Sequence, residues 1–235
     1  MTAPFLAWSH SRRKLYKSCP KALYHTAVLK KNHPDYAPYV GSKAQQDGTD
    51  IDAALTARIS AGTPLAPQYA PYEGICQVVL AAPGTKLTQV KLGFDQAFQS
   101  CGYMDWDRTW LRVIYDLAIV NPAAKRACIW DWKNGQVWPD EDQNKLFAAT
   151  GFLAWPEVDT IQTSYVWLKH GVTSDKTYHR REAADMWNDL LSDVERMQVS
   201  YQTNHWPATP SKSACRYCQV NAMGKCPVAA VKFGG

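Results

Sequence analysis

Short apolar runs and helical repeats alternate along the chain, and together they predict an α/β fold. Residues 86–94, 109–120 and 127–132 are rich in β-branched and aromatic residues and are separated by turn-like segments, which is typical of strands. Residues 160–171 alternate between apolar and polar positions and predict another strand. Because helical patterns flank and interrupt this centre, we expect a mixed central sheet flanked by helices.

The helical segments are marked by their periodicity and by their ends. One segment is entered through Gly48-Thr49 and ends at Gly62. Pro20 interrupts a helical start, so Cys19 is expected at a junction between two helical pieces. The predicted helices cover about residues 9–31, 48–61, 68–82, 140–155 and 180–201. In the last of them the expected inward residues are Ala183, Trp187, Leu190, Leu191 and Val194.

Composition narrows the class of protein. The sequence has no run of about 20 apolar residues, so no membrane span is expected, and its N-terminal segment lacks the apolar core of a signal peptide. We therefore expect a cytoplasmic protein. The net charge of +5 is mild, but basic residues gather in clusters that suit a phosphate backbone, with scattered solvated charges as the alternative. The candidate DNA contacts in these clusters are Arg12, Arg13, Lys14, Arg180 and Arg181.

Two carboxylates interrupt predicted strands where apolar residues are expected. Asp131 and Lys133 are two positions apart, so on a strand the carboxylate and the amine point to the same face. Asp116 breaks the apolar run of the preceding strand. A hard divalent cation between the two strands would offset the cost of burying both carboxylates, with Lys133 as a charged donor beside it. The alternative is an ion pair of Lys133 with either aspartate that only neutralises itself.

The order of these residues resembles that of a known family. The matching stretches are Gly48-Thr49-Asp50-Ile51-Asp52, Asp116, Asp131-Trp132-Lys133, and Gln143 with Phe147. In this order they are similar to the motifs of the PD-(D/E)xK nuclease superfamily in its RecB-like branch. The N-terminal segment up to Cys19-Pro20 and the C-terminal cysteines look like the iron–sulfur subset of that branch, which includes CRISPR-adaptation nucleases and AddB-type nuclease domains. The resemblance implies a restriction-endonuclease-like core.

The resemblance also implies a role for each matching residue. Asp116 and Asp131 would bind Mg²⁺ or Mn²⁺, Lys133 would be the catalytic lysine, and Gln143 would position the lysine or the DNA. Asp52 would be a metal ligand at the position where the family usually has histidine. An all-oxygen site suits Mg²⁺, so we expect a weaker preference for Mn²⁺ than a histidine-containing relative would show. Phe147 stands where the family has tyrosine, and the site loses that hydroxyl.

The seven cysteines fall into two groups. Cys215, Cys218 and Cys226 have the C-x2-C-x7-C spacing of a metal site and need a fourth ligand. His205 would complete a zinc site, Cys19 is the other candidate, and free thiols are the remaining alternative. The single cysteines, which we expect to be small core residues, are Cys76, Cys101 and Cys128.

The resemblance makes Cys19 the first ligand of a [4Fe–4S] cluster that Cys215, Cys218 and Cys226 complete. Four thiolates around one cluster would join the two ends of the chain. We therefore expect a single domain over residues 1–235. Its core would cover about 45–200, with helices at 5–31 and a C-terminal segment at 205–230 forming the cluster region.

Ten tryptophans are a high count for this length. Tryptophans are more often core residues, but rings in loops or at element ends could stack on single-stranded bases. The candidates in or near predicted loops or element ends are Trp8, Trp106, Trp110, Trp138, Trp155 and Trp206.

Taken together, the resemblance implies a metal-dependent exonuclease that hydrolyses phosphodiester bonds at DNA ends, with a preference for single strands. Recombination, repair and CRISPR adaptation are the processes it suits. The sequence has no P-loop, so a helicase or another recombination or adaptation partner would supply any motor. The alternative from a different class is a catalytically silent iron–sulfur scaffold that binds nucleic acid.

Overall fold

The computed structural model describes residues 5–38 and 40–234. Contacts within the chain divide it into two compact units. The first, which we call the terminal unit, combines Met1–Gly41 with Leu191–Gly235, and the second, the sheet unit, is Ser42–Leu190. The single domain expected over residues 1–235 stays a prediction, and its residues 1–4, 39 and 235 lie outside the described ones.

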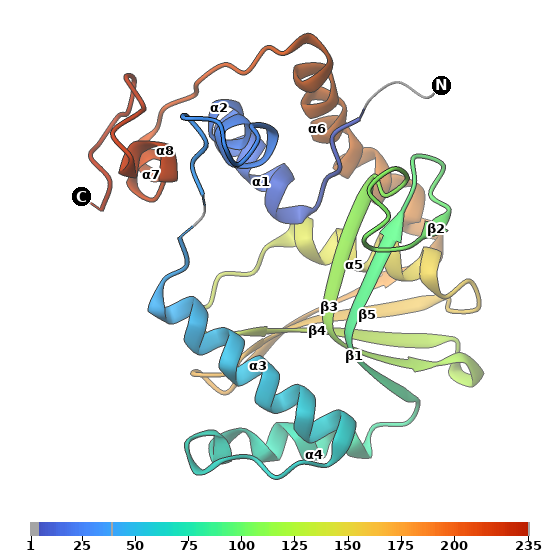
Figure 1. The fold of residues 1–235 in the computed structure, drawn as a ribbon. Helices are drawn as coiled ribbons and strands as arrows, with labels where there is room; N and C mark the ends of the chain where they lie inside the picture. Colours follow the sequence, from blue (N-terminus) through green and yellow to red (C-terminus); the bar gives the residue numbers. More distant parts are fainter. Residues whose placement is uncertain (1–4, 39, 235) are drawn as a thin grey trace. The chain divides into compact units, whose positions relative to one another are not determined.

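The sheet unit contains a six-stranded mixed sheet, which confirms the α/β class (Figure 1). The strand order is β2-β1-β3-β4-β5-β6, in which β4 and β5 are parallel and every other neighbouring pair is antiparallel. The strands are β1 (Thr85–Phe94), β2 (Ser100–Cys101), β3 (Leu111–Asn121), β4 (Arg126–Lys133), β5 (Thr160–Trp167) and β6 (Val172–His179).

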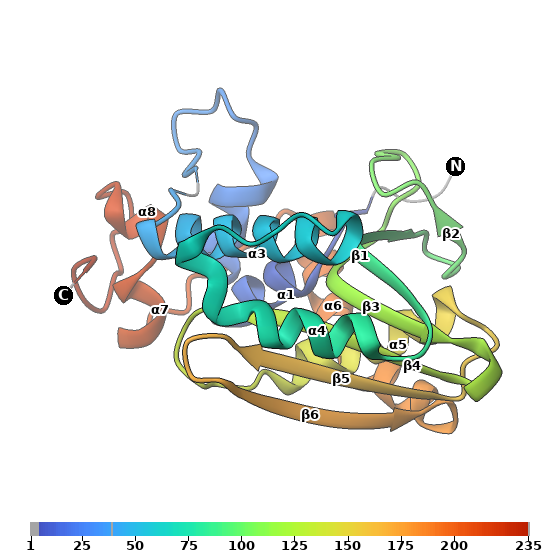
Figure 2. The ribbon, with the colours of Figure 1, turned by 90° about the horizontal axis from the view of Figure 1, so that it is seen from below.

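Helices lie on both faces of this sheet. α3 and α4 lie across one face, as Figure 2 shows, and their apolar residues form a buried cluster with Leu117 and Ile119 of β3. α5 packs on the other face and forms the crossover between the parallel strands β4 and β5. It approaches the sheet closely at Gly151, where an added Cβ would lie 2.7 Å from Ile161 and 3.0 Å from Ile129. The bounds are α3 (Lys43–Ala61), α4 (Glu73–Ala81) and α5 (Glu141–Ala154), with 3₁₀ turns at Pro67–Tyr72, Pro122–Ala124 and Arg180–Glu182.

Some boundaries differ from those predicted. α3 starts before Gly48-Thr49, because Ser42 and Gln45 form a reciprocal capping box at its N-terminus. It ends as predicted at Gly62, whose φ of +71° suits glycine. β6 was not predicted, since it is an edge strand with mostly exposed polar residues and no apolar alternation.

α6 (Ala183–Thr203) contains the predicted amphipathic face in a shifted form. Leu190 and Val194 are buried as expected, whereas Met186 and Met197 rather than Trp187 complete the buried row. Of the three single cysteines, Cys76 is fully buried, and Cys101 and Cys128 are half-buried.

The terminal unit brings the two ends of the chain together. α1 (His10–Ser18) and α2 (Pro20–Leu23) meet at Cys19, as predicted, and a π-helix (Tyr24–Val28) follows. The backbone N–H of Lys21 donates to Pro207 at 3.2 Å, and the Thr209 hydroxyl donates to the Ser18 carbonyl at 3.0 Å. The C-terminal segment carries two short helices, α7 (Lys212–Arg216) and α8 (Gln219–Ala222).

In the part of the chain that the structure describes, no helix is both long and apolar enough to span a bilayer.

Candidate active site

The end of β4 holds the carboxylate and the amine that the sequence predicts side by side. Lys133 Nζ lies 2.6 Å from Asp131 Oδ2. Gln143 of α5 contacts both groups, because its Nε2 donates to Asp131 Oδ1 at 3.2 Å and its Oε1 accepts from Lys133 Nζ at 3.4 Å. The structure therefore brings three of the predicted site residues into one hydrogen-bonded group.

Tyr165 joins this group from the neighbouring strand, and sequence reasoning missed it. In the parallel register of β4 and β5, Tyr165 stands beside Asp131. Its hydroxyl is shared between Gln143 Oε1, at 3.0 Å, and the backbone carbonyl of Asp140, at 2.8 Å. Burial, with smaller contributions from the Asp131 and Asp140 charges, raises the pKa of Tyr165, so the hydroxyl stays a donor at neutral pH. The sequence signal was only a tyrosine inside an apolar strand.

α5 begins so that Gln143 faces the site. Asp140 is the N-cap, and its side chain accepts a hydrogen bond from the Gln143 backbone N–H at 3.3 Å. Gln143 is therefore in the first turn of the helix, next to the end of β4. Phe147, one turn later, is buried against Tyr115 with 5.1 Å between the ring centroids. Phe147 therefore serves the core, and Tyr165 supplies the hydroxyl at the site.

Asp116 lies where β3 loses its regular alternation. The Tyr115 hydroxyl donates to the Phe147 carbonyl in α5 at 3.2 Å, whereas Leu117 packs with α3 and α4 on the opposite face. Residues two apart on a regular strand share a face, so the strand is distorted between these two residues. Asp116 itself accepts a hydrogen bond from the backbone N–H of Trp132 on β4 at 2.8 Å. The distortion thus turns the Asp116 carboxylate toward the strand that carries Asp131.

Gln89 is the second residue that sequence reasoning missed. It lies on β1 opposite Asp116, but the described pairing of β1 with β3 does not include it. Its backbone is left-handed, with φ of +51°. Its Nε2 donates to both carboxylate oxygens of Asp52 on α3, at 3.0 and 2.8 Å. A left-handed glutamine costs free energy, which suggests that the distortion serves the site. Gln89 holds the Asp52 side chain against the sheet.

The three carboxylates make the site strongly acidic. Burial, then the charges of Asp131 and Asp52, raises the pKa of Asp116 to about 8, against the opposing effects of the Trp132 N–H and Lys133. Burial, then the charge of Asp131, raises the pKa of Asp52 to about 6, against the hydrogen bond from Gln89. Lys133 offers one positive charge to three carboxylates. The donor set therefore fits a divalent cation, which would neutralise the remaining negative charge.

The carboxylate oxygens are turned toward protein donors in this structure. Within residues 5–38 and 40–234, no three His, Cys, Asp or Glu side chains are grouped as a ready-made metal site. At the three carboxylates, Lys133, Gln89 and the Trp132 N–H each engage one side chain. Binding of a cation would require Lys133 and Gln89 to yield some of these oxygens.

Three of the five basic residues named as candidate DNA contacts have guanidinium contacts inside the protein. Arg12 donates to the Ala7 carbonyl at 2.6 Å. Arg13 is buried, with its guanidinium 2.6 Å from Asp193. The Arg180 guanidinium donates to three backbone carbonyls in the segment 152–158. These contacts give Arg12, Arg13 and Arg180 structural roles. As DNA contacts, all five residues, including Lys14 and Arg181, stay predictions.

The cysteines with metal spacing come together in the terminal unit. Cys19, at the junction of α1 and α2, lines one pocket with Cys215, Cys218 and Cys226. Among the described residues that line this pocket, His205 does not occur. The geometry thus favours Cys19 over His205 as the fourth member of the group. The other lining residues are Ala208, Thr209, Pro210, Ala214, Asn221 and Val228.

Hydrogen bonds in the pocket suit a bound thiolate. The backbone N–H of Ala230 donates to Cys215 Sγ at 3.3 Å, a contact that stabilises negative charge on sulfur. Asn221 holds the chain around it by donating to the carbonyls of Cys215 at 2.9 Å and Val231 at 2.7 Å. Four cysteines provide the complete ligand set of a [4Fe–4S] cluster and equally of a four-cysteine zinc site. The cluster itself stays a prediction.

Comparisons with known proteins show similarity to solved structures only at a distant level. No family model matches the sequence, and no curated protein matches it. The crystal structure of a protein named SSO0001 is similar to this chain with a TM-score of 0.40 and 12% identity, over 98% of this chain and 91% of that one. A similarity of this level carries no argument about fold or function. Membership of the RecB-like branch is therefore a proposal.

Proposed function

We propose that this chain is a cytoplasmic, metal-dependent deoxyribonuclease with a restriction-endonuclease-like core of the RecB-like branch. It hydrolyses phosphodiester bonds at DNA ends and prefers single strands. The observation that carries this proposal is the group formed by Asp131, Lys133 and Gln143 at the end of β4, with Asp52 and Asp116 close enough for the charge of Asp131 to raise the pKa of both. Recombination, repair and CRISPR adaptation are the processes in which it would act, with a helicase or adaptation protein as partner.

The carboxylates and the lysine have separate roles in the proposed reaction. Asp52, Asp116 and Asp131 would hold Mg²⁺ or Mn²⁺, which supplies Lewis-acid stabilisation and lowers the pKa of a water molecule. Lys133 is an ammonium with three donors, of which two face Asp131 and Gln143. Its third donor is available to hold the attacking water or a phosphate oxygen and to stabilise the charge that develops there.

Gln143 acts as a positioning residue for Lys133. Its carbonyl oxygen faces two donors, Lys133 Nζ and the Tyr165 hydroxyl, and its amide nitrogen faces the Asp131 carboxylate. The reverse orientation of the amide would place donor against donor, so the network fixes one orientation. Lys133 is thereby held beside Gln143 and Asp131.

The pocket of the terminal unit supports a structural cofactor. We assign Cys19, Cys215, Cys218 and Cys226 as ligands of a [4Fe–4S] cluster, in keeping with the resemblance and with their common pocket. When bound, the cluster supplies four iron–thiolate bonds that join the N-terminal helices to the C-terminal segment. The protein's own contribution is the hydrogen bond from the Ala230 N–H to Cys215 Sγ and the two hydrogen bonds that Asn221 donates to the carbonyls of Cys215 and Val231.

Cleavage of end-labelled DNA tests the proposed activity. We expect wild-type protein to degrade single-stranded DNA with Mg²⁺ or Mn²⁺, and EDTA to stop the reaction. Lys133→Ala is expected to lower the rate by roughly 100-fold or more, because a preorganised donor contributes about 3 kcal/mol to transition-state stabilisation. Lys145→Ala is the matched control, since Lys145 is on α5 but pairs with Asp189 at 2.6 Å. Iron-replete wild-type protein that binds DNA without cutting it would contradict the proposal and favour the silent scaffold.

The metal preference provides a separate test of Asp52. Asp52→His is expected to raise the ratio of the Mn²⁺-supported rate to the Mg²⁺-supported rate several-fold, because imidazole favours transition ions over Mg²⁺. The control is Asp50→His, since Asp50 lies on the same helix but is exposed and bonded to Gln46. An unchanged ratio, or a wild-type rate in Asp52→Ala, would remove Asp52 from the site.

A further inference from the structure

Trp138 is an exposed tryptophan in the loop between β4 and α5. Its side chain is 81% exposed, the highest value among the large exposed apolar residues. Within the described part of the chain, its indole makes neither a hydrogen bond nor a ring contact. Val137 beside it is also exposed, at 44%. The loop therefore presents an indole ring to solvent with no packing against the described residues.

The other nine tryptophans are each buried or in contact. Trp8, Trp110 and Trp167 are buried. Trp106 is 66% exposed, but the Arg112 guanidinium lies 4.0 Å from its ring centroid and covers one face. The tryptophans that pack against other aromatic rings are Trp130, Trp132, Trp155, Trp187 and Trp206. Of the six tryptophans considered from the sequence for base stacking, Trp138 therefore keeps both faces available.

The loop that carries Trp138 connects two parts of the candidate active site. It runs from Lys133, the last residue of β4, to Asp140, the N-cap of α5. Both ends are fixed, because the Lys133 carbonyl accepts from the Leu168 N–H at 2.9 Å and the Asp140 carbonyl accepts from the Tyr165 hydroxyl at 2.8 Å. Trp138 is five positions from Lys133. Its Cα is therefore within about 17 Å of the Lys133 Cα, a span that a few nucleotides of single strand can bridge.

We infer that Trp138 is a base-stacking platform at the rim of the active site and that it sets the preference for single-stranded DNA. This inference rests on the proposed nuclease function and specifies its substrate. Bases of a single strand expose their π-faces and can stack on an indole, whatever their sequence. Bases inside a duplex are already stacked and paired, so the same indole gains nothing from them without unpairing.

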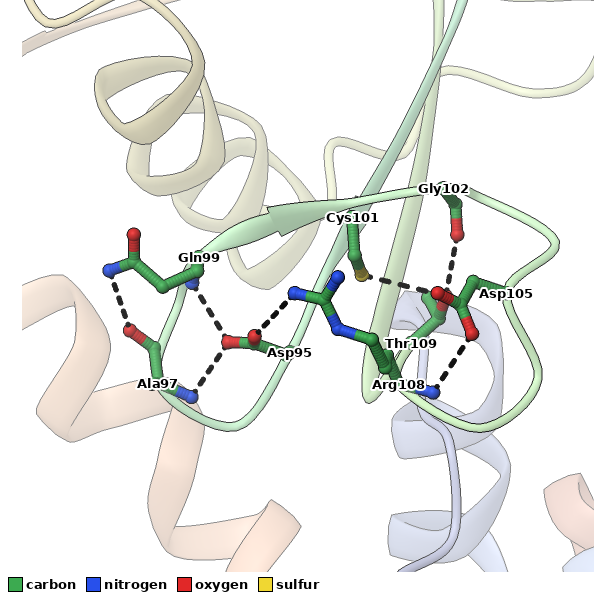
Figure 3. Close-up of polar contacts among 8 residues, drawn as sticks. All are labelled: Asp95, Ala97, Gln99, Cys101, Gly102, Asp105, Arg108 and Thr109. Carbon is green, nitrogen blue, oxygen red and sulfur yellow. Dashed lines mark hydrogen bonds and ion pairs between the residues drawn. The ribbon is translucent and has the colours of Figure 1, made fainter.

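Trp106 provides a matched control for Trp138. It belongs to the same unit and lies in the segment between β2 and β3, which is held by its own polar contacts (Figure 3). There, Asp95 pairs with Arg108 at 3.2 Å, and Asp105 accepts from the Arg108 backbone N–H at 3.2 Å. Arg112 covers one face of the Trp106 ring. Trp106→Ala therefore removes an exposed indole but leaves Trp138, the proposed stacking platform, in place.

Binding of a labelled oligothymidine and of a duplex of equal length tests the inference. The full chain with Lys133→Ala serves as the parent, in Mg²⁺, so that the DNA stays intact. Adding Trp138→Ala is expected to weaken single-strand binding about 5- to 150-fold, the range for loss of one base–aromatic stack, and to leave duplex binding within about twofold. Trp138→Phe is expected to restore most of the loss, and Trp106→Ala to cause little. Thermal unfolding should be unchanged, because Trp138 is on the surface.

The outcomes separate this inference from the function on which it rests. A parent protein that binds neither DNA would overturn the nuclease proposal together with the inference. Single-strand binding that Trp138→Ala leaves intact would overturn the inference alone. Equal losses for single strand and duplex, or an equal loss in Trp106→Ala, would also overturn it, since neither fits a stacking site at Trp138.

Discussion

Replacement of Asp116 by asparagine is expected to abolish DNA cleavage and, in metal-free buffer at pH 8, to stabilise the folded protein. Asp116 is buried beside Asp131 and Asp52, and these surroundings raise its pKa to about 8. At pH 8 Asp116 of the folded wild type is therefore about half ionised and half protonated, and both a buried charge and the uptake of a proton on folding cost stability that asparagine does not lose. The amide oxygen of asparagine can still accept from the Trp132 N–H, which in the wild type bonds to the Asp116 carboxylate at 2.8 Å. We expect a gain of about 2–4 kcal/mol in the free energy of unfolding.

The dependence of this gain on pH follows from proton linkage. The pKa of Asp116 rises from 3.8 to about 8 on folding, so the folded state holds the proton more tightly than the unfolded state. The contribution of Asp116 to stability is fully present below about pH 4 and is lost as pH rises toward 8. The difference between Asp116→Asn and wild type should therefore be near zero at pH 4, grow through neutral pH and level off above pH 8. Urea unfolding at several pH values measures it.

In the presence of Mg²⁺, we expect the wild-type protein to become more stable than Asp116→Asn. Mg²⁺ that binds only the folded state stabilises wild type in proportion to the logarithm of its concentration, whereas Asp116→Asn lacks one proposed ligand and should respond little. Asp175→Asn is the control, because Asp175 is an exposed carboxylate on β6. Stability that falls in Asp116→Asn at pH 8 without metal would contradict the placement of Asp116 among uncompensated charges.

Loss of the cysteine ligands is expected to unfold part of the terminal unit and leave the sheet unit folded. α7 and α8 contain five and four residues, too few to be stable as isolated helices. The segment after α6 therefore depends on its contacts around the cysteine pocket, and a bound cluster adds its ligand bonds to them. Cys215→Ala should lose iron and sulfide and become sensitive to proteases after about residue 205. Iron analysis and mapped proteolysis measure both effects.

Three further variants sharpen this experiment. Cys101→Ala removes a half-buried cysteine of the sheet unit and should keep the full iron content. Cys19→Ala should behave like Cys215→Ala, whereas His205→Ala should behave like wild type, since Cys19 and not His205 lines the pocket. Colourless protein with one equivalent of zinc after anaerobic purification would overturn the iron–sulfur assignment and leave a zinc site at the same cysteines.

The sequence allowed the prediction of those features that depend on neighbours along the chain. Runs of β-branched and aromatic residues located β1, β3 and β4, and apolar/polar alternation located β5. The spacing of two residues on a strand placed Asp131 beside Lys133. The Cys19 junction followed from Pro20. The parallel pairing of β4 with β5, which brings Tyr165 beside Asp131, depends on a tertiary register that no local pattern encodes.

Residues whose partners lie far away in the chain were missed or misread. Gln89 contacts Asp52 where β1 is distorted. The residues next to Gln89 in the sequence do not predict its left-handed backbone conformation. Arg13 looked like a surface cation because its partner, Asp193, comes from the other end of the chain. β6 was missed because an edge strand needs no apolar alternation.

The crossover from β4 through α5 to β5 has a consequence for the order in which the site assembles. Asp131, Lys133, Gln143 and Tyr165 all belong to residues 131–165, so their contacts close short loops and can form early in folding. Asp52 and Asp116 come from earlier elements and join only when α3 and β3 have reached their places. A divalent ion then meets its full set of carboxylates only at the final stage, which would make the metal-dependent gain in stability a kinetic reporter for completion of the sheet unit.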